Sequence, residues 1–147
     1  MTCAYDESYL SVIQDKLGNM FELAVIYMNM DIDAFTDIFL ASKVCIAMER
    51  ADPVFVLGKS ATELLALVLE IEPYEIIQSP EYSPEYWVGY ALANVQWELN
   101  VPFSKIIKAY PCSRLVLDYF PYHEMDIRQT RDMLEPYITG QKNVITD

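Results

Sequence analysis

Hydrophobic residues are densest between positions 83 and 99, where they fall on nearly every face of a helix. No charged residue occurs from Tyr86 to Trp97, and both tryptophans of the chain lie in this stretch. Ser83 is a favourable N-cap, and Pro84 suits the first helical position. A helix that is apolar all round is usually buried among other helices. The pattern therefore predicts a central buried helix over about residues 84–99.

The N-terminal segment has the period of an amphipathic helix. Apolar residues recur three and four positions apart and predict one helix over about residues 6–28, with a stripe of Leu10, Ile13, Leu17, Phe21, Ala24 and Met28. Charged residues such as Glu22 fall mostly off this stripe. Gly18 destabilises a helix by about 1 kcal/mol relative to alanine, so we expect a kink or a close helix crossing there.

Two further helices are predicted before the central one. The first covers about residues 32–49, with a buried face of Phe35, Ile38, Phe39, Ser42, Cys45 and Ile46. Pro53 cannot continue it, and residues 54–57 are expected to form a short extended apolar piece. Ser60 and Glu63 have the spacing of a capping box, which predicts a helix through position 69 or 70.

Prolines divide the C-terminal part of the chain into short elements. Residues 74–82 are expected to form an irregular, tyrosine-rich loop that leads into the central helix. A short helix is predicted over 103–109, and another is expected to stop at Pro121. The last helix is predicted over 123–138, with His123 and Glu124 in its first turn.

The whole pattern is that of an all-α protein. We expect a single compact helical domain over residues 1–140, with about six to seven helices around the central helix, and a flexible tail over 141–147. Only 4 glycines are present, too few for a turn-rich β-sandwich or barrel. No apolar stretch approaches the roughly 18 residues that a membrane-spanning helix needs.

Charge narrows the range of partners. The chain has 10 basic and 22 acidic side chains, which gives a net charge of −12. Direct nucleic-acid binding normally needs a basic face, so neither nucleic acid nor an anionic membrane is expected as a partner. An acidic surface attracts basic proteins, although simple solubility explains the charge as well. Cys3, Cys45 and Cys112 form no CxxC pair and are expected to be reduced, which, with an N-terminus unlike a signal peptide, predicts a cytoplasmic protein.

The sequence offers little catalytic or metal-binding chemistry. His123, Glu124 and Asp126 form a polar cluster, but a zinc-protease motif needs a second histidine at position 127, which is isoleucine. His123 is the only histidine of the chain. We therefore expect no metal, no cofactor and no enzymatic activity. A small enzyme that uses Glu85 with this cluster in a pocket beside the central helix remains an alternative.

Aromatic and amide side chains around the central helix indicate an interaction surface. Aromatic residues are enriched in protein interfaces, and buried amides must find hydrogen-bond partners. Asn94 and Gln96 either bond to neighbouring helix ends or line a groove. The residues predicted to contact a partner are Tyr82, Glu85, Tyr86, Asn94, Gln96, Tyr122, His123, Glu124 and Asp126.

Several segments resemble a group of small, acidic, all-helical bacterial proteins that have no established activity. The similarity lies in SPEYWVGYALA from Ser83, in Gln96-Trp97, in Phe103-x-x-Ile106 and in His123-Glu124-x-Asp126-Ile127. It extends to Gly58-x-Ser60-x-x-Glu63-Leu64, where Ala61 replaces the usual glycine. The resemblance implies that the gene lies beside one for a small protein similar to ADP-ribosyltransferase-like toxins.

These observations favour a non-enzymatic protein-binding module. The partner would be another protein, small and basic or encoded nearby, and the chain would be the neutralising or accessory component of a toxin–antitoxin-like or defence cassette. The alternative from the charge alone is an acidic mimic of nucleic acid that inhibits a nuclease. The sequence leaves the oligomeric state open.

Overall fold

All regular structure in the described part of the chain is helical, which confirms the predicted all-α class. The computed structural model describes residues 2–73 and 81–144. Seven of the ten α-helices in these ranges have seven residues or more, which is close to the predicted six to seven around the central helix. The elements are η1 (Glu7–Tyr9), α1 (Leu10–Glu22), the π-turn η2 (Leu23–Tyr27), α2 (Ile32–Leu40), α3 (Lys43–Glu49), α4 (Pro53–Val56), α5 (Ala61–Leu69), α6 (Pro84–Leu99), α7 (Phe103–Ala109), α8 (Cys112–Leu115), η4 (Val116–Asp118), α9 (Tyr119–Tyr122) and α10 (Ile127–Ile138).

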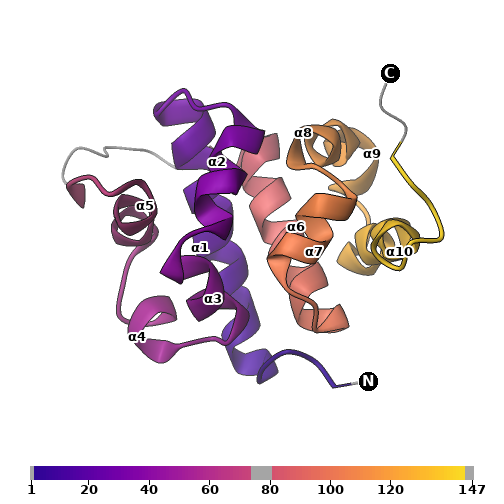
Figure 1. The fold of residues 1–147 in the computed structure, drawn as a ribbon, viewed down its shortest axis with the longest axis horizontal. Coiled ribbons are helices and arrows are strands. Elements are labelled where there is room, and N and C mark those ends of the chain that lie inside the picture. The colour runs from indigo at the N-terminus through magenta and orange to yellow at the C-terminus, as the bar shows by residue number, and fades with distance from the viewer. Residues whose placement is uncertain (1, 74–80, 145–147) are drawn as a thin grey trace.

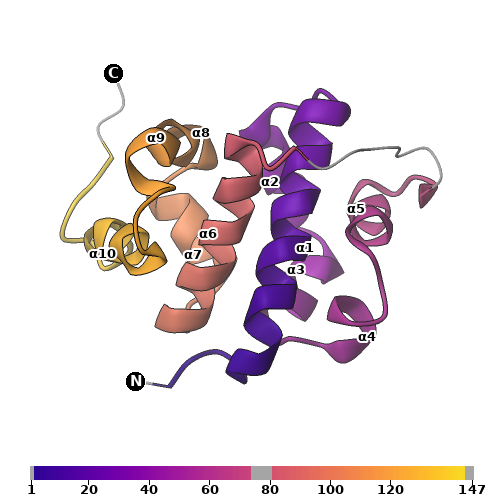
Figure 2. The ribbon, with the colours of Figure 1, turned by 180° about the vertical axis from the view of Figure 1, so that it is seen from behind.

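Helix α6 lies at the centre of the molecule, as predicted, but it shares that position with α1. The two helices run side by side in both views (Figure 1, Figure 2). Helices α2 to α5 lie on the α1 side, and α7 to α10 lie on the α6 side (Figure 1). Ser83 caps α6 by accepting a hydrogen bond from the Tyr86 amide, and the helix ends at Asn100 in the left-handed conformation. The fold therefore consists of two groups of helices that meet along the α1–α6 contact.

Two glycines let α1 and α6 approach to backbone contact. A Cβ atom placed on Gly89 would lie 2.5 Å from the Leu17 carbonyl oxygen and 2.8 Å from the Gly18 Cα atom. A Cβ atom on Gly18 would lie 2.7 Å from the Tyr86 ring. Gly18 therefore marks a close helix crossing, one of the two outcomes expected for it.

Carboxylates from the first group of helices cap helices of the second group. The Glu49 Oε2 atom accepts a hydrogen bond of 2.6 Å from the amide of Phe103, the first residue of α7. Asp33 Oδ1 accepts one of 3.0 Å from Ser113 in α8. The first amides of a helix lack partners within the helix, and the dipole there favours negative charge. Part of the acidic composition thus has a structural role.

Four phenylalanine rings continue the contact between the two groups. Phe21 of α1 packs edge-on against Phe35 of α2 at 5.1 Å, and Phe35 stacks on Phe39 at 6.3 Å. Phe39 then meets Phe103 of α7 at 5.5 Å. All four side chains are fully buried. Burial of this kind stabilises each large apolar side chain by roughly 1.5–3 kcal/mol.

The prediction of one continuous helix over residues 32–49 is wrong. The segment is divided into α2 and α3, because Ser42 accepts a hydrogen bond from the Cys45 amide and starts a new helix. The predicted buried face is also wrong at two positions, because Ile38 and Ile46 are 42% and 51% exposed. Phe35 and Phe39 are buried as expected.

Three other local predictions are corrected. Residues 54–57 are not extended, because Asp52 caps a helical turn, α4, that begins at Pro53. Pro121 lies inside α9 and does not end a helix before it. The last helix begins at Ile127, since Asp126 provides its N-cap, so His123 and Glu124 precede it.

The described end of the chain stays close to α10. Within the predicted tail, the Lys142 amide donates a hydrogen bond of 3.0 Å to the Pro136 carbonyl, and Val144 packs against the core. Residues 74–80, which form most of the predicted tyrosine-rich loop, lie outside the described residues. None of the described helices is long and apolar enough to cross a membrane.

Candidate functional site

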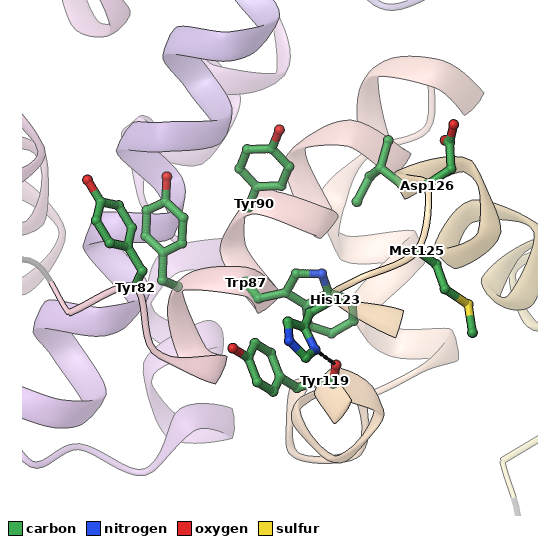
Figure 3. A pocket seen from close by; sticks show the side chains of 9 residues that line it. Tyr82, Trp87, Tyr90, Tyr119, His123, Met125 and Asp126 are labelled. Carbon is green, nitrogen blue, oxygen red and sulfur yellow. Dashed lines mark hydrogen bonds between the residues drawn. The ribbon is translucent and has the colours of Figure 1, made fainter. Parts of the chain in front are cut away.

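An open groove of about 560 Å³ lies between α6 and the segment from α9 to the start of α10. Six of its nine lining side chains carry aromatic rings, counting His123, and none is lysine or arginine. Figure 3 shows the side chains that surround this space. The lining residues are Tyr82, Tyr86, Trp87, Tyr90, Tyr119, His123, Met125, Asp126 and Ile127. We call this space the aromatic groove.

Three tyrosines form the α6 side of the aromatic groove. Tyr86 and Tyr90 are four residues apart on α6, so their side chains lie on one face, and Tyr82 precedes the helix. The Tyr82 ring meets Tyr86 edge-on at 5.0 Å, and the Tyr86 and Tyr90 rings lie 6.2 Å apart. The Tyr86 hydroxyl donates a hydrogen bond of 2.7 Å to Asp15 of α1. Burial and this hydrogen bond raise the pKa of Tyr86, so the phenol stays protonated and its ring stays in place.

A buried carboxylate positions Tyr82. Glu22 is fully buried, and its two oxygens accept hydrogen bonds from the Glu81 amide at 3.1 Å and the Ser83 amide at 2.7 Å. Tyr82 lies between these two amides in the left-handed conformation, with φ of 51°. This conformation is uncommon for a residue other than glycine, so the flanking hydrogen bonds fix the backbone there. Glu22 is therefore buried by the segment before α6, although it lies off the apolar stripe of α1.

The opposite side of the groove is formed by Tyr119 and His123, with Trp87 buried between the two sides. The His123 ring stacks on Tyr119 at 3.9 Å, and the Tyr119 ring meets Trp87 edge-on at 6.1 Å. The Nδ1 atom of His123 lies 2.6 Å from the Tyr119 carbonyl oxygen (Figure 3). Since a carbonyl only accepts, Nδ1 carries the proton, and Nε2 of the neutral ring is left as an acceptor.

Asp126 contributes the only carboxylate among the groove-lining residues, and that carboxylate is already paired. It caps α10 through the Arg128 amide at 2.9 Å and binds the Arg128 guanidinium at 2.9 and 3.1 Å. The hydrogen bonds from Arg128 lower the pKa of Asp126 to about 2. The carboxylate is therefore ionised and held by α10, which makes it a poor proton donor or acceptor at neutral pH.

The structure brings four of the nine predicted contact residues to the aromatic groove, namely Tyr82, Tyr86, His123 and Asp126. Asn94 and Gln96 do not reach it, because each is only 2% exposed within α6. The Asn94 amide donates to Glu98 at 3.4 Å, and no hydrogen-bond partner is found for Gln96 Oε1 in the described ranges.

Glu85, Tyr122 and Glu124 also lie outside the lining of the aromatic groove. Tyr122 is partly buried against the core. The side chain of Glu124 is 82% exposed, with one oxygen 3.6 Å from His123 Nε2. Glu85 is half-buried in the first turn of α6. That these three residues contact a partner stays a prediction.

Sequence reasoning did not assign five of the lining residues, namely Trp87, Tyr90, Tyr119, Met125 and Ile127. The four-residue spacing of Tyr86 and Tyr90 within the predicted central helix could have identified Tyr90. No local signal pairs α6 with the segment around Tyr119, because that contact is tertiary.

Two exposed apolar side chains, Leu117 and Phe120, lie close in sequence to Tyr119 of the groove. Phe120 is 80% exposed, and its ring lies 5.5 Å from the Tyr119 ring. Leu117, three residues earlier in the same helical run, is 73% exposed. We call this pair the apolar rim. Single exposed apolar residues are ordinary, but Phe120 contacts the groove-lining Tyr119, which favours contact of the pair with another molecule.

The arrangement supports binding better than catalysis. His123 and Asp126 are the two groove-lining side chains that ordinarily serve as acid or base, and Asp126 is bonded to Arg128. In residues 2–73 and 81–144, no group of three or more histidine, cysteine, aspartate or glutamate side chains could hold a metal ion. Comparison with protein-family models, with curated proteins and with solved structures finds no match to this chain.

Proposed function

We propose that this protein is a non-enzymatic protein-binding module whose partner docks on the aromatic groove and the apolar rim. The observation that carries the proposal is an open groove lined by six aromatic rings, with Phe120 exposed beside it. Tyrosine, tryptophan and methionine are enriched at protein interfaces because they bury a large area with few rotatable bonds. A partner segment that covers the groove and rim would bury tyrosine, tryptophan and methionine side chains.

The proposed partner is a small basic protein. The chain has a net charge of −12, and the groove lining contains no positive side chain, so the long-range field attracts cationic proteins. The resemblance described above suggests, as part of this proposal, the toxin of a toxin–antitoxin-like cassette encoded nearby. In that role the chain would act in the cytoplasm as the neutralising or accessory component.

The two alternatives have less support. A nucleic-acid mimic needs carboxylates in a continuous stripe, but Glu22, Glu49 and Asp33 are already bonded to backbone amides of distant segments. An enzyme needs an acid and a base within reach of one substrate. His123 and the paired Asp126 are a weak basis for that chemistry.

Affinity capture from the native cells, with the genomic neighbours expressed, tests the proposal. We expect one small basic protein to be retained with the wild-type chain in stoichiometric amount. Retention that resists moderate salt would indicate an apolar contact, because screening weakens only the charged part of the interaction. A chain that is recovered alone from cells that express its neighbours would contradict the proposal.

A further inference from the structure

We propose that the aromatic groove is a site for an arginine side chain, which the basic partner would insert between the tyrosines of α6 and the Tyr119–His123 stack. The inference rests on the proposed function and specifies the chemistry of the contact. It is argued from the orientation of the rings, the acceptors beside them and the charges that surround the groove.

The rings of the groove present faces in different directions. The Tyr82 and Tyr86 rings are perpendicular, and the Trp87 and Tyr119 rings are inclined by 76°. Tyr82, Trp87 and Tyr90 come from α6 and the residues before it, while Tyr119 and His123 come from the opposite side (Figure 3). The face of an aromatic ring is the negative part of its quadrupole, so a cation between such faces is attracted by several rings at once.

Acceptors at the groove fit the donors of a guanidinium group. The Nδ1 atom of His123 is used by the Tyr119 carbonyl oxygen, so Nε2 is the acceptor whenever the ring is neutral. One oxygen of Glu124 lies 3.6 Å from that Nε2 atom, and the glutamate is exposed. On the α6 side, the Tyr86 hydroxyl donates a hydrogen bond of 2.7 Å to Asp15, which lies outside the groove lining. The acceptors that a guanidinium group can use therefore lie on the His123–Glu124 side of the groove.

Charge and shape favour arginine over other occupants. The one groove-lining carboxylate, Asp126, is already bound by Arg128, so the attraction comes mainly from ring faces. The guanidinium group is planar and more weakly hydrated than an ammonium group, and it stacks on aromatic rings while it donates hydrogen bonds at its edge. A neutral apolar side chain would use the rings but leave the acceptors around His123 and Glu124 unused.

The two tryptophans provide a built-in control for a binding experiment. Trp87 lines the groove, whereas the Trp97 indole nitrogen donates a hydrogen bond of 2.7 Å to the Tyr5 carbonyl and lies outside the groove lining. Their two indole N–H signals can be followed by ¹H–¹⁵N NMR while N-acetyl-L-arginine amide is added to the full chain. The neutral comparison probe is N-acetyl-L-citrulline amide, which has nearly the same shape and no charge.

We expect a saturable shift of the Trp87 signal with the arginine probe and no shift of Trp97. The citrulline probe should bind at least about tenfold more weakly, since it lacks the cation–π attraction. Tyr82→Leu and Tyr90→Leu should each weaken arginine binding by about threefold or more, as one ring face is lost in each. Phe120→Leu, which removes an aromatic ring outside the groove lining, should leave it unchanged.

Equal shifts with both probes, or no saturable shift with either, would overturn the arginine site. Tighter binding of N-acetyl-L-lysine amide than of the arginine probe would overturn it too. These outcomes concern only the arginine site. The proposed function is tested separately, by capture of a partner protein. A partner that binds through Phe120 while neither probe binds would keep the docking surface and remove the arginine.

Discussion

Gly18 of α1 and Gly89 of α6 face each other where the two helices cross, and neither position has room for a Cβ atom. The Cβ atom of an alanine at position 89 would lie 2.5 Å from the Leu17 carbonyl oxygen and 2.7 Å from the Leu17 carbonyl carbon. Real Cβ atoms essentially never approach backbone so closely. The crossing sets the distance between the two groups of helices and, with it, the place of Tyr86 in the aromatic groove.

Gly89→Ala is expected to lower the free energy of unfolding by about 3 kcal/mol, because backbone atoms must move to relieve the clash. Gly18→Ala should be somewhat less destabilising, since only one of its three close contacts, the Tyr86 carbonyl oxygen at 2.9 Å, is a backbone atom, whereas all three contacts of Gly89 are. Urea denaturation of both variants measures the difference. Equal stability of Gly89→Ala and the wild type would show that the helices do not cross at this distance.

Glu22→Gln should lower the free energy of unfolding by about 2 kcal/mol, because a buried charge-assisted acceptor is lost. Glutamine offers one acceptor oxygen to the two amides of Glu81 and Ser83, and its own NH₂ group would face a donor. The matched control is Glu124→Gln, which removes a charge at an exposed position and should stay within about 0.5 kcal/mol. Similar denaturation midpoints for the two variants would contradict the role of Glu22.

The protein is expected to lose stability at alkaline pH through its buried phenols and thiols. Burial raises the pKa of Tyr110 to about 12, helped by its hydrogen bond to Asp118, and burial likewise raises the pKa of Cys45 to about 12. Burial raises the pKa values of Tyr5 and Cys112 as well. When folding raises the pKa of an acid, the free energy of unfolding is unaffected by ionisation of that group at any pH below its pKa in the unfolded chain. Above that pH the free energy of unfolding falls, until the pH reaches the pKa in the folded protein.

For Tyr110 the loss runs from about pH 10, the ordinary tyrosine value, to the folded value of about 12. Urea denaturation between about pH 8 and pH 11 should show the decline, under reducing conditions that keep the thiols free. Tyr110→Phe should be less stable at neutral pH, because the hydrogen bond of 2.7 Å to Asp118 is lost. Its further decline with pH should be shallower, and a parallel decline in both proteins would contradict the assignment.

The general architecture follows from local sequence signals. The apolar stretch at 84–99, the cap at Ser83 and the capping box of Ser60 and Glu63 each predict the helix that is present. The break at Ser42 was missed because the apolar period continues across it, although serine is a favourable N-cap. The start of the last helix was also misplaced, at His123, because the cap formed by Asp126, three residues later, was not recognised.

The parts that local patterns could not provide depend on tertiary contacts. Glu22 is buried because the residues before α6 pass over the end of α1, and nothing near Glu22 in the sequence indicates this. The aromatic groove likewise needs the α6 tyrosines to face Tyr119 from a distant segment. Aromatic density predicted an interaction surface near α6, but the side chains that compose it follow only from the fold.

The dissociation constant of the captured partner, measured by calorimetry with paired surface variants, tests the docking surface most directly. The test variant is Tyr82→Ser with Phe120→Ser, at positions 62% and 80% exposed, and the control is Val54→Ser with Leu57→Ser, an exposed apolar pair on and after α4. Both variants should fold like the wild type. We predict that the test variant binds at least about 30-fold more weakly, the effect of losing one hot spot, while the control binds normally. Unchanged affinity in the test variant would contradict a partner at the aromatic groove.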